Sequence, residues 1–430
     1  MLLIMNGRII APGIKTDHMA DLFIKDGIIT PLSELPDDRR ALTVLDAAGS
    51  FIAPGLVDMH VHFRDPGFLY KEDLMTGAAA AAAGGVTTAA CMPNTSPVID
   101  NAEAIADIIS RAKAAPVTIL PYAAVTLGQK GQALTDAAAL KAAGAAALSD
   151  DGMPVMNAAL LREAMKTAQA HDMLIISHCE DEELVKNYAV NEGAVSEKLG
   201  IPGRPAVAET LMVMRDVMLA KETGARLHIA HVSTAGSVEI IRRAKTDGVR
   251  VTAETCPQYF TLTEDAVLTQ GSMARINPPL RTRQDVDAVL DGLLDGTIDA
   301  VATDHAPHSA AEKALPLEKA PSGMVGLETS LALTLTMLYH TGRLPLGRIV
   351  ELMSTAPSKI LGINKGRLDT GCPADLIIFD PDEPWTVDPD KFRSKSRNTP
   401  FKGMALKGKV KYTIAGGKIV YSEDLESNFL

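Results

Sequence analysis

Residues 57–67 have the sequence Val57-Asp58-Met59-His60-Val61-His62-Phe63-Arg64-Asp65-Pro66-Gly67 and continue an apolar stretch, 51–57. The apolar stretch predicts a buried β-strand. Side chains two positions apart on a strand project from the same face, so Asp58, His60 and His62 are expected to lie together. Two imidazoles at a strand end form half of a metal site, although packing explains a lone His-x-His pair about as often. The other ligands must come from the rest of the chain.

Length, composition and charge restrict the class of protein. The chain has 430 residues, of which 47% are hydrophobic and 22% charged, as in a globular enzyme with one large and one smaller domain. A formal net charge of −11 argues against a nucleic-acid partner. The 4 cysteines form no Cys-x-x-Cys pair, so reduced thiols in a cytoplasmic protein are expected. We expect no signal peptide and no membrane-spanning segment.

Short strands and turns are predicted towards both ends of the chain. In the first part, strands are expected at 2–5, 8–11, 21–25 and 28–30, with hairpin turns at Asn6-Gly7 and Asp26-Gly27. In the last part, strands are expected at 374–380 and 409–421, the second containing a turn at Gly416-Gly417. We therefore expect one discontinuous β-sandwich domain built from residues 1–54 and 366–430.

Between these parts, helices alternate with strands. Helix–strand pairs are expected at 77–83 and 86–91, 102–114 and 117–120, 135–143 and 145–149, 160–170 and 173–178, 208–223 and 225–231, 237–247 and 249–254, and 286–294 and 298–303. So many units in succession predict a parallel sheet closed into a (β/α)8 TIM-like barrel over residues 55–365. An open doubly wound sheet is the alternative, disfavoured because no Gly-x-Gly-x-x-Gly motif follows the first strand.

Six side chains of types that bind metals stand at the ends of predicted strands, at alternating positions whose side chains are expected to point inward. They are His60, His62, Asp151, His178, His231 and Asp304. The strand ends of a barrel carry its active site. Each residue alone is more simply a hydrogen-bonded core histidine or a helix-capping aspartate. Packing gives no reason, however, for six such donors at matching positions. Four imidazoles and two carboxylates suit two divalent metals that share a carboxylate, with zinc favoured and other divalent ions compatible.

This set resembles the amidohydrolase superfamily, and the surrounding motifs resemble dihydroorotase of the long bacterial (class I) type over nearly the whole chain. The opening stretch is similar to the His-x-His-x-Arg-(Asp/Glu)-Pro-Gly signature of that family. The other similar motifs are Met92-Pro93-Asn94-Thr95, Ser149-Asp150-Asp151-Gly152, His231-Val232-Ser233-Thr234-Ala235-Gly236, Ile276-Asn277-Pro278-Pro279-Leu280-Arg281 and Ala302-Thr303-Asp304-His305-Ala306-Pro307-His308. Residues 255–259 instead resemble the corresponding stretch of hydantoinases and allantoinases, and Ser322 stands where a larger apolar residue is expected.

The resemblance implies two zinc ions per subunit. The first would be bound by His60, His62, Asp151 and Asp304, and the second by Asp151, His178 and His231. Many relatives bridge the two ions with a carboxylated lysine. No lysine lies within 145–152, which favours Asp151 as the bridge.

The resemblance also implies how the substrate is held. The substrate-contacting residues would be His62, Arg64, Asn94, Asn277, His308, Ser322 and Gly323. Arg64, Asn94 and His308 would hold the substrate carboxylate, and an arginine suits this role because it pairs bidentately with a carboxylate. Asn277 and the backbone of Ser322-Gly323 would contact the ring amides. The segment 321–326 is a candidate lid.

The activity implied is the reversible cyclisation of N-carbamoyl-L-aspartate to (S)-dihydroorotate plus water, in the de novo synthesis of pyrimidines and UMP. Metal-bound hydroxide would attack the ring amide carbonyl, with Asp304 as general base and then general acid. A homodimer is also expected.

Two alternatives to this activity stay open. One is another cyclic amidohydrolase, such as a dihydropyrimidinase, hydantoinase or allantoinase. Arg64, Asn277 and His308 disfavour it because they form a set for recognising a carboxylate. The other is a non-catalytic dihydroorotase-like partner of aspartate transcarbamoylase, which the presence of all six ligands disfavours. A complex with aspartate transcarbamoylase also stays open for an active enzyme.

Overall fold

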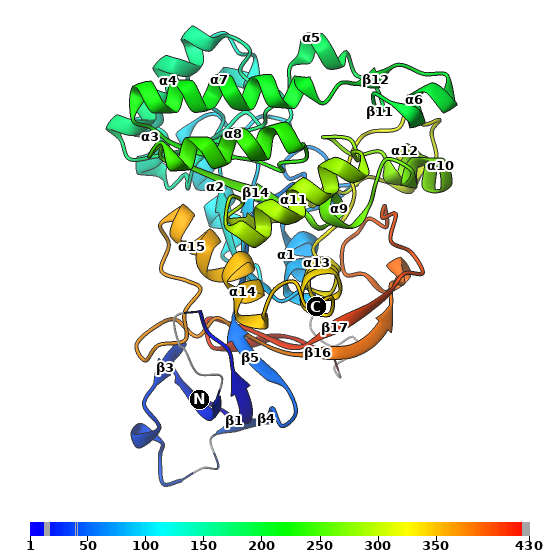
Figure 1. Ribbon diagram of the computed structural model, residues 1–430. Coiled ribbons are helices and arrows are strands. Elements are labelled where there is room, and N and C mark those ends of the chain that lie inside the picture. Colours follow the sequence, from blue (N-terminus) through cyan, green and yellow to red (C-terminus); the bar gives the residue numbers. More distant parts are fainter. Residues whose placement is uncertain (13–17, 39, 41, 424–430) are drawn as a thin grey trace.

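The computed structural model describes residues 1–12, 18–38, 40 and 42–423. Its strands form a β part built from both ends of the chain and an α/β part between them (Figure 1). Within the described residues, no helix is both long and apolar enough to cross a membrane.

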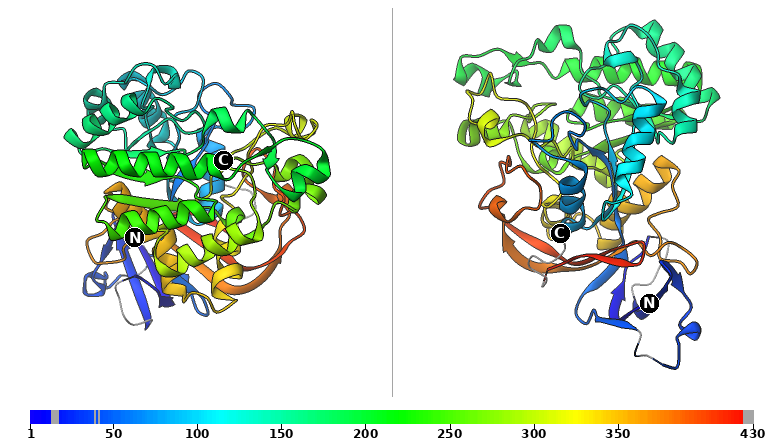
Figure 2. Two further views of the ribbon diagram at one scale, coloured as in Figure 1. Left: turned by 45° about the horizontal axis from the view of Figure 1, so that its top comes forward. Right: turned by 180° about the vertical axis from the view of Figure 1, so that it is seen from behind.

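The β part contains one hydrogen-bonded sheet of eight strands. Its strands are β1 (Leu2–Ile9), β2 (His18–Lys25), β3 (Ile28–Thr30), β4 (Thr43–Asp46), β5 (Phe51–Pro54), β16 (Leu376–Thr386), β17 (Ala405–Ala415) and β18 (Lys418–Ser422). The two ends of the chain meet where β5 pairs antiparallel with β16, and both views in Figure 2 show them side by side. Buried aliphatic side chains from both ends form the core of this part. A β-sheet domain is therefore present, and its sandwich form stays a prediction.

The predicted hairpin at Asn6-Gly7 is wrong, because the strands expected at 2–5 and 8–11 form the single strand β1. The register against β2 shifts between Ile4 and Gly7, where Asn6 has a φ of 60°, as in a β-bulge. A Cβ on Gly7 would collide with the side chain of Ile52, so close packing explains the glycine. The turns at Asp26-Gly27 and Gly416-Gly417 do connect hairpins, as predicted.

The α/β part begins where the apolar stretch 51–57 divides. Its first segment is β5 of the terminal sheet, and its second enters β6 (Leu56–Val61). Gly55 lies between them, and a Cβ there would collide with the Thr87 side chain. The stretch is therefore two strands rather than the single strand predicted.

Parallel strands and helices then alternate along the chain. The remaining strands are β7 (Val86–Cys91), β8 (Thr118–Pro121), β9 (Leu148–Ser149), β10 (Leu174–Ser177), β13 (Arg226–Ile229), β14 (Val251–Thr255) and β15 (Ala300–Val301). The helices that alternate with them are α1 (Leu74–Ala83), α2 (Ala102–Ala112), α3 (Ala137–Ala143), α4 (Ala158–Ala170), α7 (Val207–Thr223), α8 (Ala235–Thr246) and α11 (Arg283–Asp295). The hydrogen-bonded orders are β6-β7-β8 and β9-β10-β13-β14-β15.

Two isolated parallel bridges connect these two groups of strands. Ala123, just after β8, pairs with Leu148 of β9, and Val61 of β6 pairs with His305, just after β15. The second bridge includes a hydrogen bond of 2.8 Å from the His62 N–H to the His305 carbonyl oxygen. Apolar side chains from these strands, most of them small or aliphatic but including the ring of Tyr122, form a buried cluster.

Several elements were not predicted: most are two to six residues long, too short for a clear periodicity, and two longer helical runs, 330–339 and 346–361, contain π-helical turns. An excursion after β10 contains α5 (Glu182–Val185), β11 (Val190–Asn191), α6 (Ala194–Leu199) and β12 (Gly203–Arg204). The others are α9 (Pro257–Thr261), α10 (Ala266–Gln270), α12 (Ala310–Lys313), α13 (Ser330–Thr334), α14 (Leu346–Val350) and α15 (Ala356–Leu361).

Candidate metal centre

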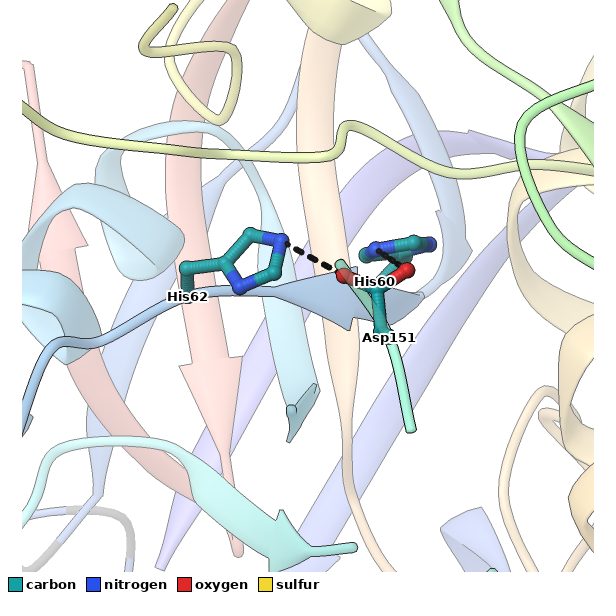
Figure 3. A group of neighbouring side chains, drawn as sticks. All are labelled: His60, His62 and Asp151. Carbon is teal, nitrogen blue, oxygen red and sulfur yellow. Dashed lines mark ion pairs between the residues drawn. The ribbon is translucent and has the colours of Figure 1, made fainter. Parts of the chain in front are cut away.

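Asp151 lies at the centre of the histidines expected to bind metal. Its Oδ1 atom is 3.4 Å from His60 Nε2, 3.5 Å from His178 Nδ1 and 3.5 Å from His231 Nε2, and its Oδ2 atom is 3.5 Å from His62 Nε2. Figure 3 shows His60 and His62 directed at this carboxylate. The potential ligand atoms form two groups that share Asp151, each with its atoms within 4.8 Å of one another.

Asp304, just after β15, lies beside the first of these groups. Its Oδ1 atom is 3.0 Å from His62 Nε2 and 3.5 Å from His60 Nε2. The structure thus brings together all six side chains selected from the strand ends. The parity argument succeeds because the carboxyl ends of parallel strands open at the same edge.

The donor set fits divalent cations. His60 Nε2 and Asp151 Oδ1 are buried and have no hydrogen-bond partner in the structure, although both face the cluster. Burial alone would lower the pKa of His60, but the carboxylates of Asp151 and Glu254 raise it well above its usual value. Burial likewise opposes protonation of His178, yet Asp151 and Glu180 raise its pKa to about 10. A buried site that holds protons against desolvation favours positive charge, and metal ions would displace those protons.

Three of the histidines are oriented by partners on the ring nitrogen that faces away from Asp151. His60 Nδ1 is 2.6 Å from Glu254 Oε1, and His62 Nδ1 is 2.9 Å from Asn94 Oδ1. His178 Nε2 is 3.6 Å from Glu180 Oε2. Such outer partners select the tautomer that directs a lone pair at a metal.

Sequence reasoning missed Glu180 and Glu254. Glu254 is fully buried on β14, where a glutamate in an apolar parallel strand is itself unusual. Burial would raise the pKa of this carboxyl, but His60 and His228 lower it to about 2. The anomaly was visible in the sequence, but its partner His60 lies 194 residues away and could not be identified.

Backbone strain is concentrated at the same place. Arg64, His231 and Asp304 have φ values of 61°, 34° and 50°, in the left-handed region that side chains other than glycine rarely adopt. Strained residues of this kind cluster at functional sites because the surrounding structure must hold them.

A basic cluster lies beside the metal ligands. Arg64 donates from Nε to the Pro307 carbonyl oxygen at 3.3 Å, and its Nη2 atom is 3.4 Å from His308 Nε2. His308 Nε2 is also 2.8 Å from the Ser322 carbonyl oxygen, while Lys71 Nζ is 3.3 Å from His308 Nδ1. Burial, together with Arg64 and Lys71, lowers the pKa of His308 to about 2. His308 is therefore neutral, with Nε2–H donating to Ser322, and Arg64 supplies positive charge.

Of the groups expected to contact the substrate ring, Asn277 lies against His178, whereas Ser322-Gly323 lies against His308 of the basic cluster. Asn277 Nδ2 is 3.4 Å from His178 Nε2, and Asn277 Oδ1 accepts from Arg204 Nη1. Gly323 has a φ of 134°, and a Cβ there would lie 2.7 Å from Ala306 Cβ. Glycine is therefore required at this position.

The stretch 255–259, which resembles hydantoinases and allantoinases, lies next to the centre. Gln258 Nε2 donates to the Thr303 carbonyl oxygen at 3.2 Å, and the Tyr259 hydroxyl donates to the Pro278 carbonyl oxygen at 2.8 Å. Thr303 precedes Asp304, and Pro278 follows Asn277. The two side chains therefore support the backbone on both sides of the site.

Comparisons with known proteins agree with this geometry. Residues 49–237 match a family described as Dihydro-orotase-like. Dihydroorotase from Acetivibrio thermocellus is 48% identical over 423 residues, covering 98% of this chain and 99% of that protein. Dihydroorotase from Pelotomaculum thermopropionicum is 51% identical over 423 residues, with the same two coverages. Among solved structures, the L-hydantoinase (dihydropyrimidinase) of Arthrobacter aurescens superimposes with a TM-score of 0.87 at 28% identity, covering 98% of this chain and 96% of that one.

These two dihydroorotases, which are about 50% identical to this chain, match almost its whole length, and the chain covers almost the whole length of each of them. The chain therefore belongs to the dihydroorotase family.

Proposed function

We propose that this chain is a two-zinc dihydroorotase, which interconverts N-carbamoyl-L-aspartate and (S)-dihydroorotate in pyrimidine synthesis. The observation that carries the proposal is the convergence of four imidazoles on the Asp151 carboxylate, directly beside Arg64 and His308. The full-length likeness to dihydroorotases supports the reaction. Imidazole-rich ligation supports zinc as the metal.

We also propose that residues 55–365 form a closed (β/α)8 barrel and that residues 1–54 and 366–430 form the second domain. The two bridges between the strand groups support closure, because they would join β8 to β9 and β15 to β6. The likeness to a hydantoinase over nearly the whole chain supports the same architecture.

His60, His62, Asp151 and Asp304 would hold one ion, and Asp151, His178 and His231 the other. When bound, the two ions would lower the pKa of a water molecule to about 7 and polarise the amide carbonyl of the substrate. Glu254, Asn94 and Glu180 keep the ligand rings in the tautomers that this binding requires.

Asp304 would move the proton of the reaction. In the hydrolytic direction, the ring C–N bond breaks, the water oxygen bonds to the carbonyl carbon, and one water proton passes to the leaving nitrogen. A carboxylate can accept that proton and then donate it, provided that it lies within hydrogen-bond reach. Asp304 is held there by its strained backbone and by its approach to His62.

Arg64 would bind the carboxylate that the substrate keeps throughout the reaction. Arg64 is half-buried, and its guanidinium donates to a backbone carbonyl and forms no ion pair with a carboxylate among the described residues. A half-buried guanidinium without an ionic partner, next to a neutral His308, suits an incoming anion. This feature favours dihydroorotate over the uncharged rings of other cyclic amidohydrolase substrates.

Purified enzyme should be assayed with dihydroorotate, hydantoin, dihydrouracil and allantoin in parallel. We expect turnover of dihydroorotate alone, and turnover of only the other three would overturn the proposal. Metal analysis of the same preparation separates the enzyme from a non-catalytic partner of aspartate transcarbamoylase. A metal-free, inactive protein would favour that partner.

We further propose a cytoplasmic homodimer. The support for a dimer is a line of exposed apolar residues along α7, comprising Val207, Leu211, Met214 and Met218. Their spacing places them on one face of the helix, which a symmetry-related α7 can cover. Light scattering should show a dimer that Met218→Lys weakens, and a monomeric parent protein would refute it. A complex with aspartate transcarbamoylase is a separate question for co-purification.

A further inference from the structure

A buried lysine lies outside the residues given a role so far. Lys313, at the end of α12, is only 1% exposed. Its Nζ atom donates to the carbonyl oxygens of Arg275 at 3.2 Å, Pro321 at 3.0 Å and Gly323 at 3.0 Å. These bonds use all three donors of an ammonium group. No carboxylate forms an ion pair with it among the residues that the structure describes.

Such an arrangement is unfavourable for folding alone. Burying a charge without an ionic partner costs free energy, and an apolar side chain of similar length would fill the space more cheaply. Burial and the nearby Arg275 lower the pKa of Lys313 to about 7, which reports the same penalty. The groups that Lys313 contacts should therefore explain why a lysine stands at this position.

The three carbonyl groups border both of the segments expected to contact the substrate ring. Asn277 lies two positions after Arg275, and Ser322 lies between Pro321 and Gly323. The Gly323 N–H also donates to the Arg275 carbonyl oxygen at 3.0 Å, so Lys313 reinforces a direct link between the two segments. In addition, the Ser322 carbonyl accepts from His308.

A second anchor acts on the same loop from the C-terminal part of the chain. Asn398 Nδ2 donates to the carbonyl oxygens of Gly323 at 3.0 Å and Ala306 at 3.1 Å. Residues 323–327 are buried. The candidate lid 321–326 is thus held closely in place, which suits a fixed wall of the site.

We propose that Lys313 is a positioning residue for substrate recognition, whose ammonium clamps the backbone at residues 275, 321 and 323 and so fixes the spacing between Asn277 and the Ser322-Gly323 backbone. The inference rests on the proposed function, since the ring contacts belong to it. The Lys313 ammonium contacts backbone carbonyls and, among the described residues, none of the six side chains expected to bind metal.

The test compares Lys313→Met with Lys319→Met in the full-length, metal-loaded enzyme. Lys319 is an exposed lysine of the same loop, so its variant controls for loss of charge. We expect Lys313→Met to raise KM for both dihydroorotate and N-carbamoyl-L-aspartate at least tenfold, with kcat changed less than threefold and metal content unchanged. The control should match the parent protein. A folded, metal-loaded Lys313→Met enzyme with KM within twofold of the parent would overturn the proposal.

Hydrogen exchange gives a readout that needs no substrate. Peptides covering 314–326 should exchange faster in Lys313→Met than in the control, and unchanged exchange would refute the clamp. If the parent enzyme does not turn over dihydroorotate, the proposed function fails while this arm still decides the clamp. If the methionine variant does not fold, Lys313→Leu, which likewise has no side-chain N–H donor, takes the same measurements with the same criteria.

Discussion

Replacing Glu254 by glutamine should weaken metal binding while leaving the fold intact. The glutamate carboxylate lies 2.6 Å from His60 Nδ1, and both side chains are fully buried. Glutamine has almost the same shape and can still accept the Nδ1 hydrogen through its amide oxygen. The change therefore removes the negative charge and keeps the contact.

The expected magnitude follows from this contact. A hydrogen bond to a charged group is worth about 1.5–3 kcal/mol, against about 1 kcal/mol for a neutral one. The difference of about 0.5–2 kcal/mol corresponds to a roughly two- to thirtyfold weaker zinc affinity, since about 1.4 kcal/mol is tenfold. Losses of about 10–100-fold are typical when the outer partner of a metal-binding histidine is removed. Glu254→Ala should lie at the upper end, because it removes the whole side chain that faces both His60 and His228.

The assay is a zinc titration of chelator-treated protein against a chromophoric competitor, with metal content measured after dialysis. Glu103→Gln is the control, because Glu103 is an exposed residue of α2 and makes the same chemical change. Circular dichroism and the thermal midpoint establish that each variant is folded. Zinc affinity of folded Glu254→Gln within twofold of the parent protein would refute the reasoning.

Three further predictions concern separate parts of the molecule. Asp304→Asn should fold normally and lose about 10²–10⁴-fold in kcat, as expected for a lost general base; near-parental turnover would exclude the proton-transfer role. Burial raises the pKa of the Cys91 thiol to about 12. This thiol should therefore react slowly with a disulfide reagent at pH 8 until denaturant is added, and rapid labelling of the native protein would contradict its burial. Burial raises the pKa of Glu328 from 4.5 to about 7, so its contribution to stability is complete below pH 4.5 and is lost as the pH rises through 7. In urea unfolding, Glu328→Gln should therefore raise the free energy of unfolding, relative to the parent protein, by more at pH 8 than at pH 5. An equal difference at both pH values would show that Glu328 does not titrate in this way.

Periodicity predicted the regular elements of the fold well, because long amphipathic helices and apolar strands carry a repeated signal. The amphipathic helix expected at 102–114 is Ala102–Ala112, and the strand expected at 86–91 is Val86–Cys91. Asn6-Gly7 misled the prediction because this dipeptide suits a bulge as well as a turn. The division of the stretch 51–57 between two sheets depends on partners more than 30 residues away, which no local pattern contains.

The clustering of the six side chains could be predicted because strand parity and a common sheet edge place side chains from distant segments together. The outer partners could not, because each depends on which rings meet across the site. Asn94 illustrates the difference. Expected to bind the substrate carboxylate, it contacts His62 through Oδ1 and donates from Nδ2 to the Asp151 carbonyl oxygen at 3.4 Å. It is therefore also a support for the metal ligands.

The stretch at the end of β6 would couple the proposed metal binding to the proposed substrate recognition through its backbone. His60 and His62 face Asp151, and Arg64, two residues on, turns away through a strained φ of 61° to reach Pro307. The His62 N–H is bonded to the His305 carbonyl, next to Asp304. Loosening the contact between β6 and the end of β15 would thus displace ligands, proton carrier and carboxylate-binding group together. This shared backbone explains how one His-x-His-x-Arg sequence can set both the metal site and its specificity.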